Sequence, residues 1–308
     1  MALRIPAIMT RRMAEAPFDT PNADLVLRSS DDVSFGVQRA ILAEASPIFE
    51  DMLSIPQPPP VRTPDPASPT GPPVVDLTET SRALDHLLRF CYPVDNPDLP
   101  TAEDVFGVLE AAKKYMMGAV VRAVHARWFA AHAEREPMRM YVGACRRGWE
   151  DEMRLAARAS LARPFVDFRD VRELEEVSAG SYLRLQAYHR ACRKAAASLH
   201  YAGVDFSSAH HARPRRIWYT RKSKRHGDAH VEPWWTEYME RAREALLVRP
   251  CGATVLTPEL SYKFLLDVVA KLPLHERTRI LFDLTPFNLE FAECIDRAVS
   301  QVRHKGLT

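Results

Sequence analysis

Glycine is scarce in this chain, which contains 11 glycines among 308 residues. Phosphate-binding loops depend on closely spaced glycines, and the sequence contains neither a G-x-G-x-x-G motif nor a P-loop. The nucleophile elbow G-x-S-x-G and the zinc motif H-E-x-x-H are also absent. No apolar run approaches the roughly 18 residues that a membrane-spanning helix needs. The sequence therefore predicts a protein that is not an enzyme, uses no cofactor and does not span a membrane.

Cysteine and net charge are low as well. The five cysteines are odd in number and widely spread, and no C-x-x-C motif occurs among them. This pattern argues against a disulfide framework and favours a reducing compartment, either the cytoplasm or the nucleus. The net charge of +2 gives the chain no overall field that would favour nucleic acid or an anionic membrane.

The clearest pattern in the chain is a β-hairpin followed by two short helices, between residues 24 and 53. An apolar run at 25–27 precedes a turn rich in Ser and Asp, and apolar side chains then alternate along residues 33–37. A helical pattern follows. Ser46 and Pro47 predict the N-cap and the first turn of a second helix.

The same stretch carries a set of characteristic positions: Asp24, Phe35, Val37, Arg39, Leu42, Ser46, Phe49, Met52 and Leu53. Together with this order of elements, these positions resemble the BTB (POZ) domain, a protein-interaction module without catalytic chemistry. Gln38 stands where that family usually has His, a tolerable departure. The resemblance predicts an α+β domain, in which a small sheet is capped by a helical cluster.

The predicted BTB-like domain covers residues 23–134 and follows a flexible N-terminus at 1–22. Nine of the 18 residues at 56–73 are proline, which predicts an inserted surface loop without helix or strand. A short strand is expected after this loop. Helices follow it, one of them opened by a capping box of Thr101 and Asp104. Gly118 is expected to break that helix, and another helix is expected from about Ala119 to Ala133.

The remaining residues, 136–308, are predicted to form an all-α domain with a basic loop near 200–231. Pro250, Pro273 and Pro286 are expected to end helices. The predicted helices cover residues 138–145, 150–161, 179–199, 258–272 and 287–302, and a further helix begins near Trp234.

The helix predicted at 179–199 carries a second resemblance. It is similar to a helix of the region that follows the BTB domain in many fungal proteins, whose molecular role the pattern does not define. We predict an apolar stripe of Leu183, Leu185, Tyr188 and Cys192 on this helix. The residues that match the fungal pattern are Tyr182, Leu185, Tyr188, His189 and Cys192.

A zinc site is one interpretation of His189 and Cys192, which lie three residues apart on this predicted helix. His210, His211 and His226 follow in the basic loop and could complete such a site. The isolated positions of the cysteines favour the other interpretation, a buried Cys beside a hydrogen-bonded core His. We therefore predict no metal site.

A basic segment at 213–225 holds seven basic residues and no acid. The favoured interpretation is a solvated loop, in which Trp218 and Tyr219 dock onto the helical domain. A nuclear-localisation signal at 221–225 and a phosphate- and base-binding segment are the alternatives. Its candidate residues are Arg213, Arg215, Arg216, Arg221, Lys222, Lys224 and Arg225.

Asp24 and Arg39 are the candidates for a dimer interface. The resemblance implies that the matching acid and base face each other in a charged pocket near that interface. An intramolecular ion pair that holds strand to helix is an equally good interpretation, since buried charges need partners.

The sequence thus predicts an interaction scaffold that self-associates through its BTB-like domain and presents a client protein through its helical domain. One alternative is a substrate adaptor of a cullin-type ubiquitin ligase. Such adaptors usually carry a hydrophobic-x-acid contact after the Met-Leu helix, and Ser54-Ile55-Pro56 weakens this interpretation. The other alternative is a transcriptional or chromatin regulator that uses the basic segment, although binding to nucleic acid is not the favoured role.

A mitochondrial presequence at the N-terminus is disfavoured, because Pro6 interrupts any helix there.

Overall fold

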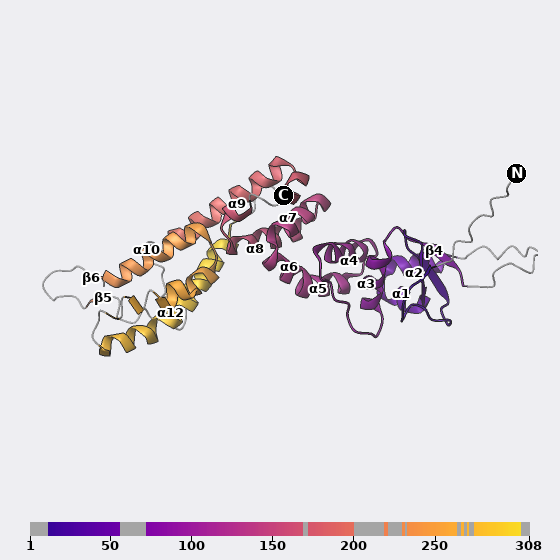
Figure 1. Cartoon of the computed structure of the whole chain (residues 1–308), viewed down its shortest axis with the longest axis horizontal. Coiled ribbons are helices and arrows are strands. Elements are labelled where there is room, and N and C mark those ends of the chain that lie inside the picture. Colours follow the sequence, from indigo (N-terminus) through magenta and orange to yellow (C-terminus); the bar gives the residue numbers. More distant parts are fainter. Residues whose placement is uncertain are drawn as a thin grey trace, which may run out of the picture. The chain divides into compact units, whose positions relative to one another are not determined.

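The structure is a computed structural model that divides into two compact units, residues 1–132 and 133–308 (Figure 1). The residues that the structure describes are 12–55, 72–168, 172–199, 219–220, 230–231, 233–263, 266–267, 270 and 274–302.

A small mixed sheet forms one side of the first unit. In the described part of the chain it has four strands, in the order β1-β3-β2-β4. The two central strands pair antiparallel as the predicted hairpin, which is confirmed, while β1 runs parallel to β3 and β4 runs parallel to β2. The strands are β1 (Arg12–Met13), β2 (Leu25–Arg28), β3 (Val33–Val37) and β4 (Val74–Asp76).

Strand β3 is buried on both faces. Phe18 covers it: the Phe18 side chain is fully buried, its ring centroid lies 5.8 Å from that of Phe35, and its carbonyl accepts a 2.8 Å hydrogen bond from the Gly36 N–H. A Cβ atom on Gly36 would lie only 3.0 Å from the Cβ of Ala23, so this close approach needs glycine.

The prediction of a flexible N-terminus at 1–22 is therefore wrong for β1 and for Phe18. A two-residue strand and a single aromatic residue beside Pro17 leave no periodic pattern in the sequence, and only the tertiary pairing with β3 reveals them. Residues 1–11 lie outside the described part of the chain, as do residues 56–71 of the predicted proline loop.

Two helices of the first unit begin where the capping residues in the sequence predict. Ser46 accepts a hydrogen bond from the Phe49 N–H and Pro47 is the first residue of α2, while Thr101 and Asp104 form the expected capping box. The helices are α1 (Arg39–Ala45), α2 (Pro47–Ser54), α3 (Ser81–Cys91), α4 (Ala102–Lys114), α5 (Gly118–Val124), the π-helix η1 (His125–Phe129) and α6 (Ala130–Arg135), within which the two units meet.

The predicted single helix from Ala119 to Ala133 differs from the structure in two ways. Gly118 does not break a helix but begins α5, because the chain turns earlier, at Met116, whose φ of 54° is left-handed. The following residues then change from α-helical to π-helical hydrogen bonding at η1 before returning to α-helix in α6.

The second unit is mostly helical, and its longest elements are α9, α10 and α12 (Figure 1). The exception is a two-residue antiparallel pair, β5 with β6, in the segment predicted as a basic loop. The elements are α7 (Pro137–Arg147), α8 (Glu150–Ala159), η2 (Ser160–Ala162), η3 (Phe165–Phe168), η4 (Arg172–Glu176), α9 (Ala179–Ser198), β5 (Tyr219–Thr220), β6 (His230–Val231), α10 (Pro233–Val248), η5 (Gly252–Leu256), η6 (Glu259–Lys263) and α12 (Leu274–Ser300).

Two sequence predictions for this unit are wrong. Pro286 does not end a helix, since α12 runs through it. Packing after the proline holds α12 together: Phe291 and Ile295 are fully buried, and the Tyr238 hydroxyl donates a 2.6 Å hydrogen bond to the Asn288 side chain.

Leu183 is the second error, because its side chain is 58% exposed and does not belong to the buried stripe of α9. Ser181 takes its place in that stripe. Four residues then recur at intervals of three and four, which is the helical repeat. The buried residues of the stripe are Ser181, Leu185, Tyr188, Cys192 and Ala196.

Candidate interaction surface

Asp24 and Arg39 lie together in the structure. Asp24 stands directly before β2, and one of its carboxylate oxygens accepts a 2.8 Å hydrogen bond from the backbone N–H of Arg39. The Arg39 guanidinium turns to α2 and donates a 2.7 Å hydrogen bond to the carbonyl of Leu53. The contact joins strand to helix, as the intramolecular interpretation expected, but through the backbone and not through an ion pair of the two side chains.

Both side chains therefore bond backbone groups at helix ends that have no partner within the helix. Arg39 is the first residue of α1, and within the described residues Gln38 supplies no side-chain cap to that helix. The Asp24 carboxylate provides the missing acceptor and places negative charge at the positive end of α1. The guanidinium likewise bonds one of the last carbonyls of α2. Asp24 remains exposed, so its charge is available on the surface of the unit.

Apolar side chains are exposed on α2, the helix whose Leu53 carbonyl binds the Arg39 guanidinium. Ile48 is 36% exposed, Met52 is half-buried, and Ile55, directly after the helix, is 61% exposed. Their spacing of four and three residues puts them on the same side of the helix. We call these three residues the α2 face. Neighbouring exposed apolar residues are typical of protein contact surfaces.

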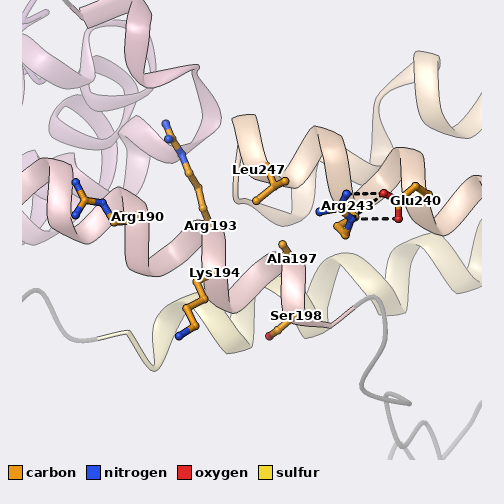
Figure 2. A pocket seen from close by; sticks show the side chains of 8 residues that line it. All are labelled: Arg190, Arg193, Lys194, Ala197, Ser198, Glu240, Arg243 and Leu247. Atoms are coloured by element: carbon orange, nitrogen blue, oxygen red, sulfur yellow. Dashed lines mark hydrogen bonds and ion pairs between the residues drawn. The ribbon is translucent and has the colours of Figure 1, made fainter.

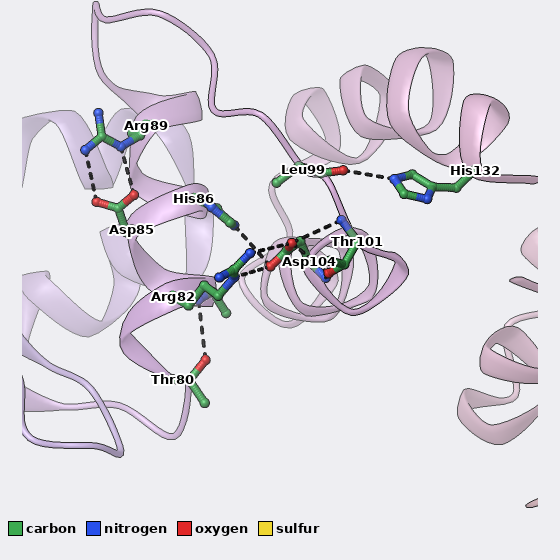
Figure 3. Close-up of polar contacts among 10 residues, drawn as sticks. Thr80, Arg82, Asp85, His86, Arg89, Leu99, Thr101, Asp104 and His132 are labelled. Carbon is green, nitrogen blue, oxygen red and sulfur yellow. Dashed lines mark hydrogen bonds and ion pairs between the residues drawn. The ribbon is translucent and has the colours of Figure 1, made fainter. Parts of the chain in front are cut away.

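A polar cluster joins α3 and α4 in the first unit (Figure 3). The buried Asp104 carboxylate accepts hydrogen bonds from both Nε and Nη2 of Arg82, the latter at 2.8 Å, and from the Thr101 hydroxyl at 2.7 Å. Burial alone would raise the pKa of Asp104. The bonds from Arg82 and Thr101 outweigh that effect and lower its pKa to about 2.

His86 completes this cluster, with its Nδ1 4.0 Å from an Asp104 oxygen. Burial lowers the pKa of His86 below its usual 6.5, against the opposing charge of Asp104, so the ring is neutral at pH 7. The ionised Asp104 and the neutral His86 thus connect α4 to α3. Their protonation states do not suit proton transfer between them, and we interpret the cluster as stabilising the packing of the two helices.

In the second unit, His189 and Cys192 are core residues. The His189 Nε2 lies 2.7 Å from the Ser160 hydroxyl, its ring packs 4.7 Å from that of Phe165, and Cys192 is fully buried. Burial, followed by the charge of Arg193, lowers the pKa of His189 to about 3.

No group of three or more His, Cys, Asp or Glu side chains that could hold a metal ion occurs among the described residues. The other zinc candidates, His210, His211 and His226, lie outside them. The structure thus shows a hydrogen-bonded core His beside a buried Cys at the two positions it describes.

The candidate residues of the basic segment also lie outside the described part of the chain. Only the backbone pairing of β5 with β6 is described there. The residues concerned are Arg213, Arg215, Arg216, Arg221, Lys222, Lys224 and Arg225.

Sequence reasoning missed a hollow of about 760 Å³ between α9 and α10 (Figure 2). Four of its lining side chains are cationic: Arg190, Arg193, Lys194 and Arg243. The spacing of the first three, at i, i+3 and i+4 on a predicted helix, was the available signal. The partner helix could not be known, because Arg243 lies far along the chain.

Comparison with known protein families agrees with this geometry. The model of the BTB/POZ domain family matches residues 18–127, and this part of the chain is a BTB/POZ domain. No curated protein matches the chain. Among the described residues, no helix is both long and apolar enough to cross a membrane.

Proposed function

We propose that the protein is a non-enzymatic scaffold that self-associates through its BTB/POZ domain and presents a client protein through its helical unit. The observation that carries this proposal is the BTB/POZ domain at residues 18–127, since domains of this family are protein-interaction modules that often dimerise. The exposed α2 face gives such a module an apolar contact area. The fungal type of the chain, suggested by the helix at 179–199, is part of the same proposal.

The surface proposed for self-association contains Asp24, Arg39 and the α2 face. Two different roles are open to the Asp24 carboxylate, since it caps α1 and also leaves a negative charge exposed. A symmetric dimer brings the same patch of both copies together, so one charged residue acts twice in the interface.

Two substitutions separate these roles. Asp24→Asn keeps an oxygen that can accept the Arg39 N–H but removes the charge, whereas Asp24→Ala removes both. If the charge is used in a dimer, sedimentation velocity of the full chain should show a dimer for the wild type and weaker association for Asp24→Asn at nearly unchanged melting temperature. Asp24→Ala should additionally lose about 0.5–2 kcal/mol of stability, the usual effect of a lost cap.

Ile48→Ser tests the apolar part of the same surface and should also weaken the dimer. A wild-type chain that remains monomeric well above micromolar concentration overturns self-association, whatever the variants do. If both Asp24 variants dimerise like the wild type, the dimer forms through another surface.

The adaptor and regulator roles are narrower versions of this proposal. Ile55 offers an exposed hydrophobic residue directly after α2, which favours a cullin contact, but Pro56 and Gln57 follow it where the family's contact has its acid. Affinity purification with mass spectrometry decides between the roles. Recovery of a cullin supports the adaptor, and recovery of a chromatin complex supports the regulator.

Cellular location, cytoplasmic or nuclear, depends in this proposal on the basic segment at 221–225. Changing its four basic residues to Ala should move a tagged protein out of the nucleus if the segment is a localisation signal. A wild-type protein found only in the cytoplasm contradicts that role.

A further inference from the structure

The hollow between α9 and α10 is lined by side chains of both helices (Figure 2). Arg190, Arg193 and Lys194 lie on α9, and Arg243 lies on α10. The hollow belongs entirely to the second unit, and its α9 wall continues from Arg190 to Ser198. At 1.5 Å per residue this wall is about 12 Å long, which matches three or four residues of an extended peptide.

The positive charge of this groove is only partly compensated. Glu240 is the single acid among the described residues that line it, and it is already bonded by Arg243, with distances of 3.0 and 3.1 Å from Nε to the two carboxylate oxygens. The described residues offer no ion pair or side-chain hydrogen bond to Arg190, Arg193 or Lys194.

One nitrogen atom of Arg193 lacks a hydrogen-bond partner. Its Nε is buried and has no hydrogen-bond partner among the described residues. Buried donors are nearly always bonded in folded proteins, so such a group indicates a missing partner. Arg190 and Lys194, one helical turn apart, repel each other and weaken the helix slightly. A negatively charged ligand relieves this repulsion, and its charge compensates that of the Arg193 guanidinium.

The remaining lining residues favour a peptide over a nucleic acid. Ala197 and Leu247 give the groove apolar contact area, and Leu247 is 39% exposed. None of the described lining residues is aromatic, whereas single-stranded nucleic acids are held mainly by stacking on aromatic rings. Guanidinium groups match carboxylates in two-point hydrogen bonds.

We propose that the groove between α9 and α10 binds an acidic segment of a partner protein, with Arg190, Arg193 and Lys194 bonding its carboxylates. This assignment rests on the proposed scaffold function and gives its client a chemical class. The basic segment at 213–225 cannot fill the groove, because it holds seven basic residues and no acid.

The test is fluorescence anisotropy of the full chain with a labelled peptide in which Glu alternates with Gly. Binding should occur at low salt and weaken as salt rises, since the contacts are electrostatic. A peptide in which Gln replaces Glu should not bind. Arg193→Gln, and separately the double variant Arg190→Gln with Lys194→Gln, should raise Kd about tenfold or more, the usual effect of losing a charged hydrogen bond.

Arg184→Gln is the matched control, because Arg184 lies on the same helix, bonds Ser181 and does not line the groove. Thermal melts followed by circular dichroism must be unchanged in each variant. If Arg193→Gln does not fold, the double variant at the exposed Arg190 and Lys194 provides the test. The proposal is overturned if the Glu peptide does not bind, if Arg184→Gln weakens binding equally, or if only changes at 221–225 abolish it.

A single-stranded oligonucleotide is run in parallel. If it binds through the groove residues and the Glu peptide does not, the ligand is a nucleic acid and the proposal is wrong. Sedimentation of the same variants tests self-association separately from peptide binding. If the wild type is a dimer but does not bind the peptide, only the groove assignment is wrong. If it is a monomer that binds the peptide, only the proposal of self-association is wrong.

Discussion

Phe49 lies at the contact between α2 and the end of α4 in the BTB/POZ domain. Its fully buried ring stacks on that of Tyr115, with centroids 4.5 Å apart and planes inclined by 23°. Next to the rings, the Ser46 hydroxyl donates a 2.6 Å hydrogen bond to the Tyr115 carbonyl and accepts one from the Phe49 N–H. The start of α2 and the end of α4 are thus fixed by apolar and polar contacts together.

Replacing Phe49 by Ala should remove about 3–5 kcal/mol of stability, the usual cost of truncating a buried aromatic residue. This loss is large beside the total of about 5–15 kcal/mol that holds a typical domain. Urea denaturation followed by circular dichroism measures it. Asp51→Ala, at an exposed position of the same helix, is the control and should stay close to the wild type. Equal effects at the two positions would contradict the burial of Phe49.

Asp104 should make the stability of the first unit depend on pH. Its pKa of about 2 in the folded protein lies below the usual 3.8, so the ionised carboxylate stabilises the fold above about pH 4. That contribution is lost as the pH falls from about 4 toward 2, where the acid takes up a proton.

The measurement is the difference in unfolding free energy between the wild type and Asp104→Asn. It should be constant above about pH 5 and shrink as the pH is lowered toward 2, because the protonated wild type then resembles the amide. A difference that does not change with pH would show that the charge of Asp104 contributes nothing beyond its shape.

Residue-level predictions from the sequence had a definite limit. The resemblance implied that Asp24 and Arg39 face each other, but it could not tell which atoms meet, since a carboxylate bonds a guanidinium or a helix N–H equally well. The groove needs Arg193 and Arg243 from two separate helices, and no local pattern shows that those helices pack together.

At the scale of elements, local chemistry explains most of what could be predicted. The hairpin β2–β3, the helix start at Ser46 and the capping box at Thr101 each depend on residues close in sequence. The failures depend on distant residues. Strand β1 exists through its pairing with β3, and α12 continues through Pro286 because later residues are buried.

The proline-rich loop between α2 and β4 should contribute little to stability. Loop-closure entropy changes only slowly with loop length. Replacing residues 58–71 by a Gly-Ser linker of equal length preserves closure, and the melting temperature should stay nearly unchanged. Pro73 is retained, because its carbonyl accepts a 2.9 Å hydrogen bond from the Val26 N–H. A large fall in melting temperature would mean that the loop packs on the domain.

At the scale of the whole molecule, the chain consists of two units with separate cores. The first contains the sheet and the stacked Phe49 and Tyr115, while the second has a core in which Phe287 stacks on Phe291, with centroids 5.4 Å apart. Because each unit buries its own apolar residues, each has its own source of stability.

Calorimetry of the full chain should therefore show two transitions, and one variant in each core should assign them. Phe49→Ala should lower the first unit's transition by about 10 °C or more, or abolish it, while the other transition stays in place. Phe291→Ala, at a fully buried position, should do the reverse. Independent unfolding suits a scaffold in which one unit self-associates and the other holds a client. If either variant moves both transitions together, the units unfold as one cooperative body, and binding at the groove should then stabilise the BTB/POZ domain as well.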